Sequence, residues 1–145
     1  MFKLKSVMSR AAVSVGAALV GTAVALVATG TPAQAATPKC NAAGTQMTLR
    51  GVLLDLPVYR TGSSTTVLCG VYEGDSGDDV NQLQWTLIYC YSENLKQDGK
   101  FGTKTKAALV RAQGREHVKA DGSYGPNTAL ALLHPQLGPG GCGKL

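Results

Sequence analysis

Apolar residues recur at helical spacing in the second half of the chain. A helix that starts near Ser76 would place one set of apolar side chains on a single face, namely Val80, Leu83, Leu87 and Cys90. Asp79 follows Ser76 by three residues, the spacing of a capping box at a helix start. The pattern therefore predicts a first helix from about Ser76 to Cys90.

Two shorter helices are predicted after it. The second starts near Thr103, ends near Gly114, and turns three small or apolar residues toward the core: Ala108, Leu109 and Ala112. The third runs from Pro126, a residue suited to a first helical position, to about Leu133, and is stopped by Pro135.

The first part of the chain has a strand-like composition instead. Residues 36–44 are small and polar, and we expect them to be loose. Residues 47–59 and 65–68 are rich in Val, Leu and Thr, and Thr-Gly-Ser-Ser at 61–64 between them is typical of a turn. We expect two short strands joined by that turn, with Pro57 restricting any ladder to an edge.

One eight-residue phrase occurs twice. Residues 98–105 and 121–128 both read Asp-Gly-x-aromatic-Gly-x-x-Thr, and the second copy follows the first by 23 residues. Asp-Gly favours a tight turn, because Gly tolerates positive φ and Asp bonds its own backbone. The aromatic residue can fold under the turn, and the second Gly can precede a helix. Each copy therefore predicts a turn, a buried aromatic ring and a helix start.

The repeat and the helix before it resemble the peptidoglycan-binding domain found beside many bacterial cell-wall hydrolases. That family's pattern has a Gly-Asp-x-Gly start, Val-x-x-Leu-Gln on the first helix, and an Asp-Gly turn before each later helix. Here the first two motifs are residues 74–77 and 80–84. The resemblance covers residues 74–133. It implies a mainly α fold, a three-helix bundle preceded by a short β-hairpin-like N-terminal segment and stapled by disulfides.

The chain departs from the family at two positions. Trp85 stands where a polar residue is usual, and Ala112 precedes Gln113 where the family has Phe-Gln. A missing Phe would leave a destabilising void in the core. We expect Trp85, Tyr89 or the N-terminal strands to fill it.

Residues 1–35 have the parts of a secretory signal peptide: basic residues, an apolar run at 11–28, and Ala-Gln-Ala at 33–35. The run is long for a signal, so an uncleaved membrane anchor is the alternative. We divide the rest into a Cys-containing β-prone segment at 36–73, a peptidoglycan-binding-like domain at 74–134, and a Gly-rich tail at 135–145.

Charge gives little support for nucleic-acid binding. The chain has a net charge of +5, but residues 1–35 hold three of the 14 Lys and Arg and none of the nine Asp and Glu. Residues 36–145 therefore carry a net charge of +2, with the basic residues scattered and without a nucleic-acid-binding motif. This balance suits an anionic cell wall.

Four cysteines follow the predicted signal: Cys40, Cys69, Cys90 and Cys142. An even number in a small exported chain predicts disulfides, and four cysteines allow three pairings. We favour Cys40–Cys69 and Cys90–Cys142, which would staple the N-terminal segment to itself and the first helix to the tail. The other pairings, which would tie the N-terminal segment to the helical domain, stay open. No spacing indicates zinc, and we expect no cofactor.

No motif for catalysis is present. The only histidines are His117 and His134, and the sequence has no His-Glu-x-x-His motif, no Gly-x-Ser-x-Gly elbow and no phosphate loop. The hydrolases that accompany this family would need a further domain of roughly 100 residues. We therefore expect a protein that is not an enzyme.

The candidate ligand site lies between the two turns, beside the starts of the second and third helices, whose free N–H groups favour anions such as stem-peptide carboxylates. Its residues are Asp98, Lys100, Phe101, Asp121, Ser123 and Tyr124. Lys100 and Ser123 are the freest candidates. The two aspartates are also turn formers, and the two aromatics are also core residues, with the Tyr124 hydroxyl expected at the surface.

Trp85 is the remaining candidate ligand residue. It either packs under the N-terminal segment or stacks on a sugar ring, since carbohydrate rings bind aromatic faces through their C–H groups.

Together these features predict a secreted, non-catalytic, monomeric protein that binds the glycan strand or the stem peptide of peptidoglycan. It would be extracellular or associated with the cell wall of a Gram-positive bacterium, without nucleic-acid partners and without membrane contact after signal cleavage. The alternatives are a protein-interaction module that docks a secreted cell-wall hydrolase, and a small wall-degrading enzyme.

Overall fold

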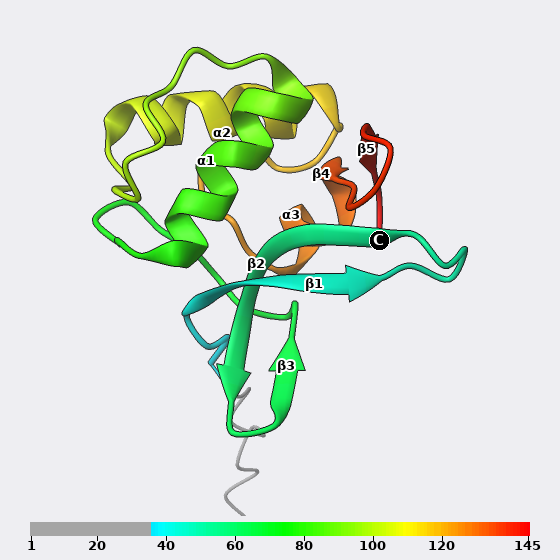
Figure 1. The fold of residues 1–145 in the computed structure, drawn as a ribbon. Helices are drawn as coiled ribbons and strands as arrows, with labels where there is room; N and C mark the ends of the chain where they lie inside the picture. Colours follow the sequence, from blue (N-terminus) through cyan, green and yellow to red (C-terminus); the bar gives the residue numbers. More distant parts are fainter. Residues whose placement is uncertain (1–35) are drawn as a thin grey trace, which may run out of the picture. The chain divides into compact units, whose positions relative to one another are not determined.

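Three antiparallel strands come first in the computed structural model, which describes residues 36–145. Strand β1 (Ala42–Met47) pairs with β2 (Leu53–Thr61), and β2 pairs with β3 (Ser64–Thr66), in the order β1-β2-β3 (Figure 1). The predicted signal peptide and its alternative, a membrane anchor, fall on residues 1–35 and lie outside the described residues.

The sheet is larger than the sequence suggested. Residues 42–44, expected to be loose, belong to β1, and the strand-like region contributes three strands instead of two. Pro57 lies within the middle strand, opposite Ala43. Its missing N–H is tolerated because β3 pairs only with Tyr59 to Thr61, so that β2 has a single neighbour at Pro57.

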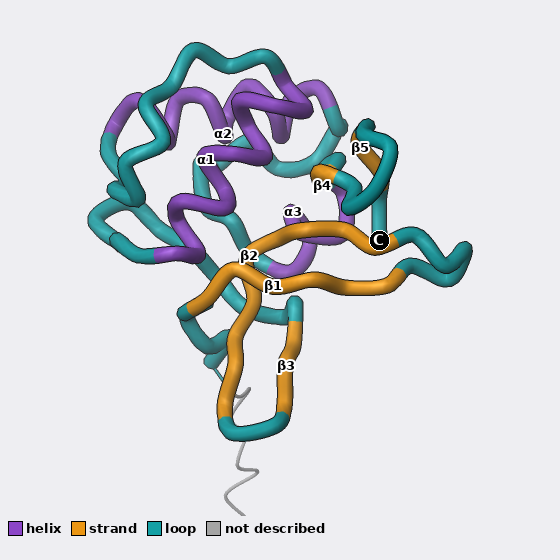
Figure 2. Tube along the Cα trace, viewed as in Figure 1, coloured by secondary structure: helices purple, strands orange, loops and turns teal. Residues whose placement is uncertain are grey.

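Three helices follow: α1 (Asp78–Tyr91), α2 (Thr103–Arg115) and α3 (Pro126–Ala131). They lie together on one side of the sheet (Figure 2). Each begins directly after a glycine, and no N-cap side chain bonds to a helix start. The expected capping box at Ser76 is therefore wrong, and Gly77 is the N-cap of α1.

The described residues contain two apolar clusters. The larger joins the three helices and includes the aromatic rings of both repeat copies, with its fully buried members Val71, Val80, Leu83, Leu87, Ala108, Leu109, Ala112, Tyr124, Ala129 and Leu132. The smaller consists of Leu54, Leu56 and Val58, alternate residues of β2 that point to the same face of the sheet. Helix α1 contacts both α2 and β2, so it lies between the two clusters.

The C-terminal residues fold back onto this framework. Strand β4 (His134–Pro135) pairs with β5 (Cys142–Gly143), and Gln136 forms a bridge to Leu54 of β2. The disulfides are Cys40–Cys69 and Cys90–Cys142, the two pairs favoured from the sequence. The second joins α1 to β5.

The expected fold class, a mainly α three-helix bundle, is wrong. The helices have 14, 13 and 6 residues, and they are accompanied by a three-stranded sheet and a two-stranded one. The third helix is a short one, and β2, at nine residues, buries its own apolar face instead of forming a small hairpin appendage. The protein is therefore a mixed α and β structure with two disulfides.

Candidate functional site

A buried glutamine on α1 holds the first copy of the repeat. Gln84 Nε2 lies within hydrogen-bond distance of Asp98 Oδ1 (3.0 Å), Lys100 O (3.0 Å) and Thr105 Oγ1 (3.2 Å). Its Oε1 accepts a hydrogen bond from Gly99 N at 2.8 Å. One amide therefore ties the turn to the start of α2.

Gln113 on α2 repeats this arrangement for the second copy. Its Nε2 lies 3.3 Å from Asp121 Oδ1, 3.0 Å from Ser123 O and 3.0 Å from Thr128 Oγ1. Its Oε1 accepts a hydrogen bond from Gly122 N at 2.9 Å. Neither glutamine was predicted to have a role. The available signal was a glutamine ahead of each Asp-Gly turn, as in Leu-Gln at 83–84 and Ala-Gln at 112–113.

Both turns need glycine at their second position. Gly99 and Gly122 have φ angles of 66° and 72°, in the left-handed region that costs other residues steric strain. At Gly122 an added Cβ would also lie 2.6 Å from Lys106 Cγ, so the second turn packs closely against α2.

The carboxylates of Asp98 and Asp121 are used by the turns. Asp98 Oδ1 accepts from Lys100 N at 3.1 Å, and Asp121 Oδ1 accepts from Ser123 N at 2.9 Å. The hydrogen bond from Gln84 holds the pKa of Asp98 below its usual value, and the backbone bond from Ser123 does the same for the pKa of Asp121. Only part of each carboxylate is left for a ligand.

The two repeat aromatics lie in the core. Phe101 is almost fully buried and Tyr124 is fully buried, so neither ring offers a face to solvent. The Tyr124 hydroxyl was expected at the surface; it is buried without a hydrogen-bond partner in the described residues, and burial raises its pKa. Burying the ring against α3 and β4 is what withdraws this hydroxyl from solvent.

The two turns flank one connecting segment, residues 71–77. Val71 forms a bridge to Tyr124, and Ser76 forms a bridge to Lys100. The Gly-Asp-x-Gly motif, residues 74–77, bonds to the first copy through its backbone, as in Phe101 N to Asp75 O at 2.9 Å, whereas Val71 bonds to Tyr124 of the second copy. The segment as a whole therefore contacts both copies.

A groove of about 440 Å³ lies at the second turn. Asp121 and Ser123 line it with Tyr72, Lys119 and the first residues of α3. Lys119 is largely exposed, and its Nζ lies 3.3 Å from Asp121 Oδ2. The groove therefore offers an ammonium group, a carboxylate and hydroxyl groups to a polar ligand.

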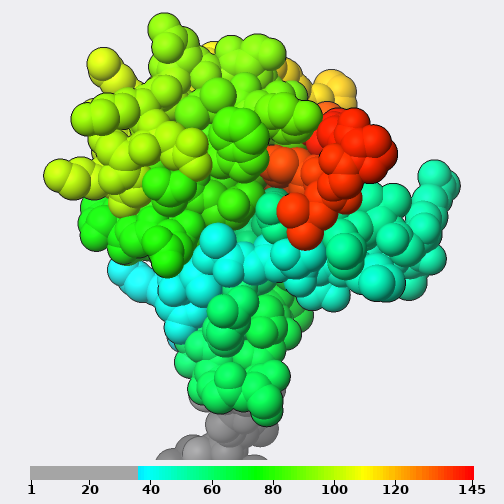
Figure 3. Space-filling model, viewed as in Figure 1, coloured from blue at the N-terminus to red at the C-terminus, as the bar shows by residue number. Residues whose placement is uncertain are grey.

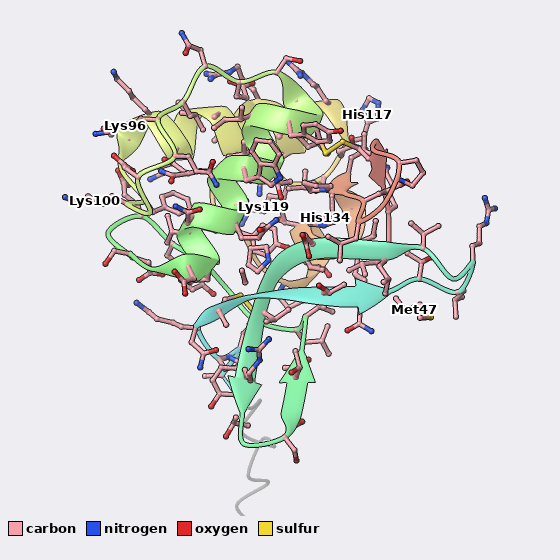
Figure 4. All side chains as sticks on the ribbon, viewed as in Figure 1. Met47, Lys96, Lys100, His117, Lys119 and His134 are labelled. Carbon is pink, nitrogen blue, oxygen red and sulfur yellow. A yellow bond between two sulfur atoms is a disulfide. The ribbon has the colours of Figure 1, made fainter. Side chains whose placement is uncertain are left out.

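Lys100 does not line this groove. Figure 4 shows Lys96 and Lys100 projecting outward on the same side of the molecule, beside the first turn. The predicted set is thus divided: Asp121 and Ser123 share a groove, Lys100 lies with a second lysine, and the aromatics are internal.

Trp85 and Tyr89 form an exposed aromatic pair on α1. Their ring centroids are 5.1 Å apart with an interplanar angle of 23°, and their exposed fractions are 37% and 44%. The N-terminal segment therefore does not bury Trp85.

Trp85, Tyr89 or the N-terminal strands were expected to fill the space left by Ala112. The exposed Trp85 and Tyr89 lie outside the helical cluster that contains Ala112, whereas Tyr59 of β2 packs against that cluster. Tyr91 also belongs to the cluster, and its hydroxyl donates to Glu116 Oε1 at 2.9 Å.

The two histidines have different surroundings. His134 is buried, with Nε2 2.7 Å from Ala129 O, and His117 lies exposed after the end of α2. Within residues 36–145, no group of three or more His, Cys, Asp or Glu side chains could hold a metal ion. None of the helices in this part of the chain has the length and apolar character to cross a membrane.

Comparison with solved structures found a protein of similar fold over part of the chain. The chain is similar to a peptidoglycan-binding protein from Clostridioides difficile, solved in complex with glutamine hydroxamate, with 23% identity and a TM-score of 0.45. That match covers 59% of this chain and 53% of the other, so the chain spans about half the length of that structure. The comparison with curated proteins found no match.

The family model described as "Putative peptidoglycan binding domain" matches residues 76–132. This range holds α1, α2, α3, both turns and both glutamines that fix them. The match covers 57 of the 145 residues and supports a peptidoglycan-binding domain in this part of the chain.

Proposed function

We propose that the protein is exported and binds cell-wall peptidoglycan without catalysing a reaction on it. The family match at residues 76–132 carries this proposal, because it covers the three helices and both turns. The family supports a binding role at the cell wall. The two disulfides are consistent with an oxidising, extracellular location, here proposed as the wall of a Gram-positive bacterium.

The groove at the second turn suits the stem peptide of peptidoglycan. Lys119 can pair with a peptide carboxylate, and Asp121 Oδ2 can pair with an amine once a ligand displaces Lys119. Ser123 lines the same groove beside them. Lys96 and Lys100 would add attraction to anionic wall polymers, at long range and in a salt-dependent way.

A pull-down with purified sacculi tests the proposal. We expect the protein to sediment with protein-free murein at low salt, and Lys119→Ala to reduce its retention several-fold. Lys104→Ala is the matched control, because Lys104 is an exposed lysine of α2 outside the groove. Wild-type protein left entirely in the supernatant would reject the proposal.

One observation favours the alternative, docking to a secreted hydrolase. A second groove, of about 400 Å³, is lined by exposed apolar side chains, among them Met47, Leu49, Leu68 and Leu130. Clustered exposed apolar residues are typical of protein-binding surfaces. Retention on native walls combined with loss of retention on protein-free murein would support this function. Clearing of a wall suspension by the protein alone would support the third alternative, an enzyme.

A further inference from the structure

The aromatic pair on α1 has no role in the groove or in the core. Trp85 is the only tryptophan of the chain, and it stacks on Tyr89 one helical turn later. We propose that this pair binds the glycan strand of peptidoglycan by stacking against a pyranose ring. The inference rests on the proposed function and adds a subsite separate from the groove at the second turn.

The pair is held in place by the C-terminal tail. Tyr89 Oη accepts a hydrogen bond from Gly141 N at 3.2 Å, and the neighbouring residue Cys90 is joined to Cys142. Figure 3 shows the tail, in red, lying against the green surface of α1. Because Tyr89 is anchored and Trp85 stacks on it, a ligand would lose less entropy in ordering these rings.

Two amide side chains lie near Trp85 on α1, and one of them, Asn81, already accepts a hydrogen bond from Gln97 Nε2 at 2.7 Å. Asn81 and Gln82 precede Trp85 by four and three residues, which places their amides beside it on the helix. Gln82 Nε2 donates to Asp55 O at 3.1 Å, so its Oε1 faces no competing donor among the described contacts. Amides can exchange hydrogen bonds with sugar hydroxyl and N-acetyl groups.

These features favour a neutral sugar over the other candidate occupants. A stem peptide presents carboxylates, and the pair offers them no cation. A protein partner would suit the apolar groove of Met47, Leu49 and Leu130 better, because apolar side chains gather there. Flat aromatic faces flanked by amides match the apolar C–H face and polar rim of an N-acetyl sugar.

The uniqueness of Trp85 makes the inference directly measurable. Titration of the disulfide-intact protein with the tetramer of N-acetylglucosamine should change the tryptophan emission in a saturable way. A tetrapeptide with the stem-peptide sequence should leave the emission unchanged. By calorimetry, Trp85→Ala should weaken binding of the tetramer by about tenfold or more, whereas Trp85→Phe, which keeps a stacking ring, should lose less.

Lys104→Ala is the control, because Lys104 is an exposed residue of α2 outside the aromatic pair, and the tetramer affinity of this variant should equal that of the wild type. Unchanged emission at millimolar tetramer, or an emission response to the tetrapeptide alone, would overturn the glycan site. Sacculus binding that persists alongside such a result would leave the proposed function standing. Conversely, a tetramer response without retention on sacculi would uphold the sugar site and reject murein as the target.

Discussion

Gln84 and Gln113, on successive helices, each hold one of the two Asp-Gly turns by hydrogen bonds. Each presents its Oε1 to the N–H of a turn glycine. Its Nε2 faces the turn aspartate, a backbone carbonyl and the threonine at the third position of the next helix. Both side chains are almost fully buried. A buried amide whose hydrogen bonds are all made stabilises the fold. Removing the amide leaves its buried partners without hydrogen bonds, which lowers the free energy of unfolding.

We expect Gln113→Ala to lower the free energy of unfolding by about 2–4 kcal/mol, because the buried Gly122 N–H would lose its acceptor and the turn its donor. Urea denaturation measures the change. Gln97→Ala is the control: Gln97 is exposed and bonds only to Asn81, so its loss should cost about 0.5 kcal/mol or less. Equal losses for the two variants would contradict the role given to Gln113.

His134 gives the protein a pH dependence. Burial lowers the pKa of its imidazole from 6.5 to about 4. Between these values the unfolded chain binds a proton that the folded protein does not, so lowering the pH favours unfolding. We expect the contribution of His134 to fall by about 3 kcal/mol as the pH drops from about 7 to about 4.

Urea midpoints measured across this pH range test the His134 prediction. A wild-type midpoint that stays constant from pH 6.5 to 4.5 would show that His134 is not buried in its neutral form.

At the scale of elements, the helices end less regularly than they begin. All three start after a glycine, as the repeat predicts for α2 and α3. Helix α1 ends at Ser92, whose φ of 57° and ψ of 34° are left-handed, a conformation in which glycine is usual. The sequence carries no glycine there, and the predicted end near Cys90 came from the spacing of apolar residues instead.

Replacing Ser92 by glycine should therefore stabilise the protein. Removing the steric cost of the left-handed conformation is expected to add about 0.5–1 kcal/mol, which corresponds to a rise in Tm of a few degrees. Thermal unfolding followed by circular dichroism measures it. The same change at Asn94, an exposed residue without positive φ, should be neutral or destabilising. A lower Tm for Ser92→Gly would refute the strain argument.

At the scale of the whole molecule, the two disulfides close loops in different parts of the fold. Cys40–Cys69 has a sequence separation of 29 and encloses the sheet. Cys90–Cys142 has a separation of 52 and fastens the tail to α1, next to Tyr89. Figures 1 and 3 show β5 and the tail beside α1, and the hairpin between β1 and β2 projecting from the body.

Replacing both members of a pair by serine should cost about 3.5 kcal/mol for Cys40–Cys69 and about 4 kcal/mol for Cys90–Cys142 in the chain-entropy model. Urea midpoints of the two double variants measure these costs, and peptide mapping without reduction checks the pairing itself. Losing Cys90–Cys142 should also weaken tetramer binding at Trp85, whereas losing Cys40–Cys69 should not. Equal tetramer affinity in both variants would show that the tail does not support the sugar site.

The sequence by itself determined what depends on neighbouring residues. The starts of α2 and α3, the two turns and the buried Phe101 follow from short-range rules, since Asp-Gly turns and helix starts are set within a few residues. The ordered motifs also predicted the match of residues 76–132 to the peptidoglycan-binding domain. The sequence favoured the disulfides that the structure shows but left the other pairings open.

Only the tertiary structure decided the rest, because it depends on contacts between distant residues. The pairing of β1 with β2 makes the fold mixed instead of the expected helical bundle. Pro57 fits into β2 because β2 has only one neighbouring strand at that position. The partners of Gln84 and Gln113 lie up to 21 and 15 residues away. The exposure of Trp85 depends on how α1 sits between sheet and tail, since helical spacing places a side chain on a face without saying what covers that face.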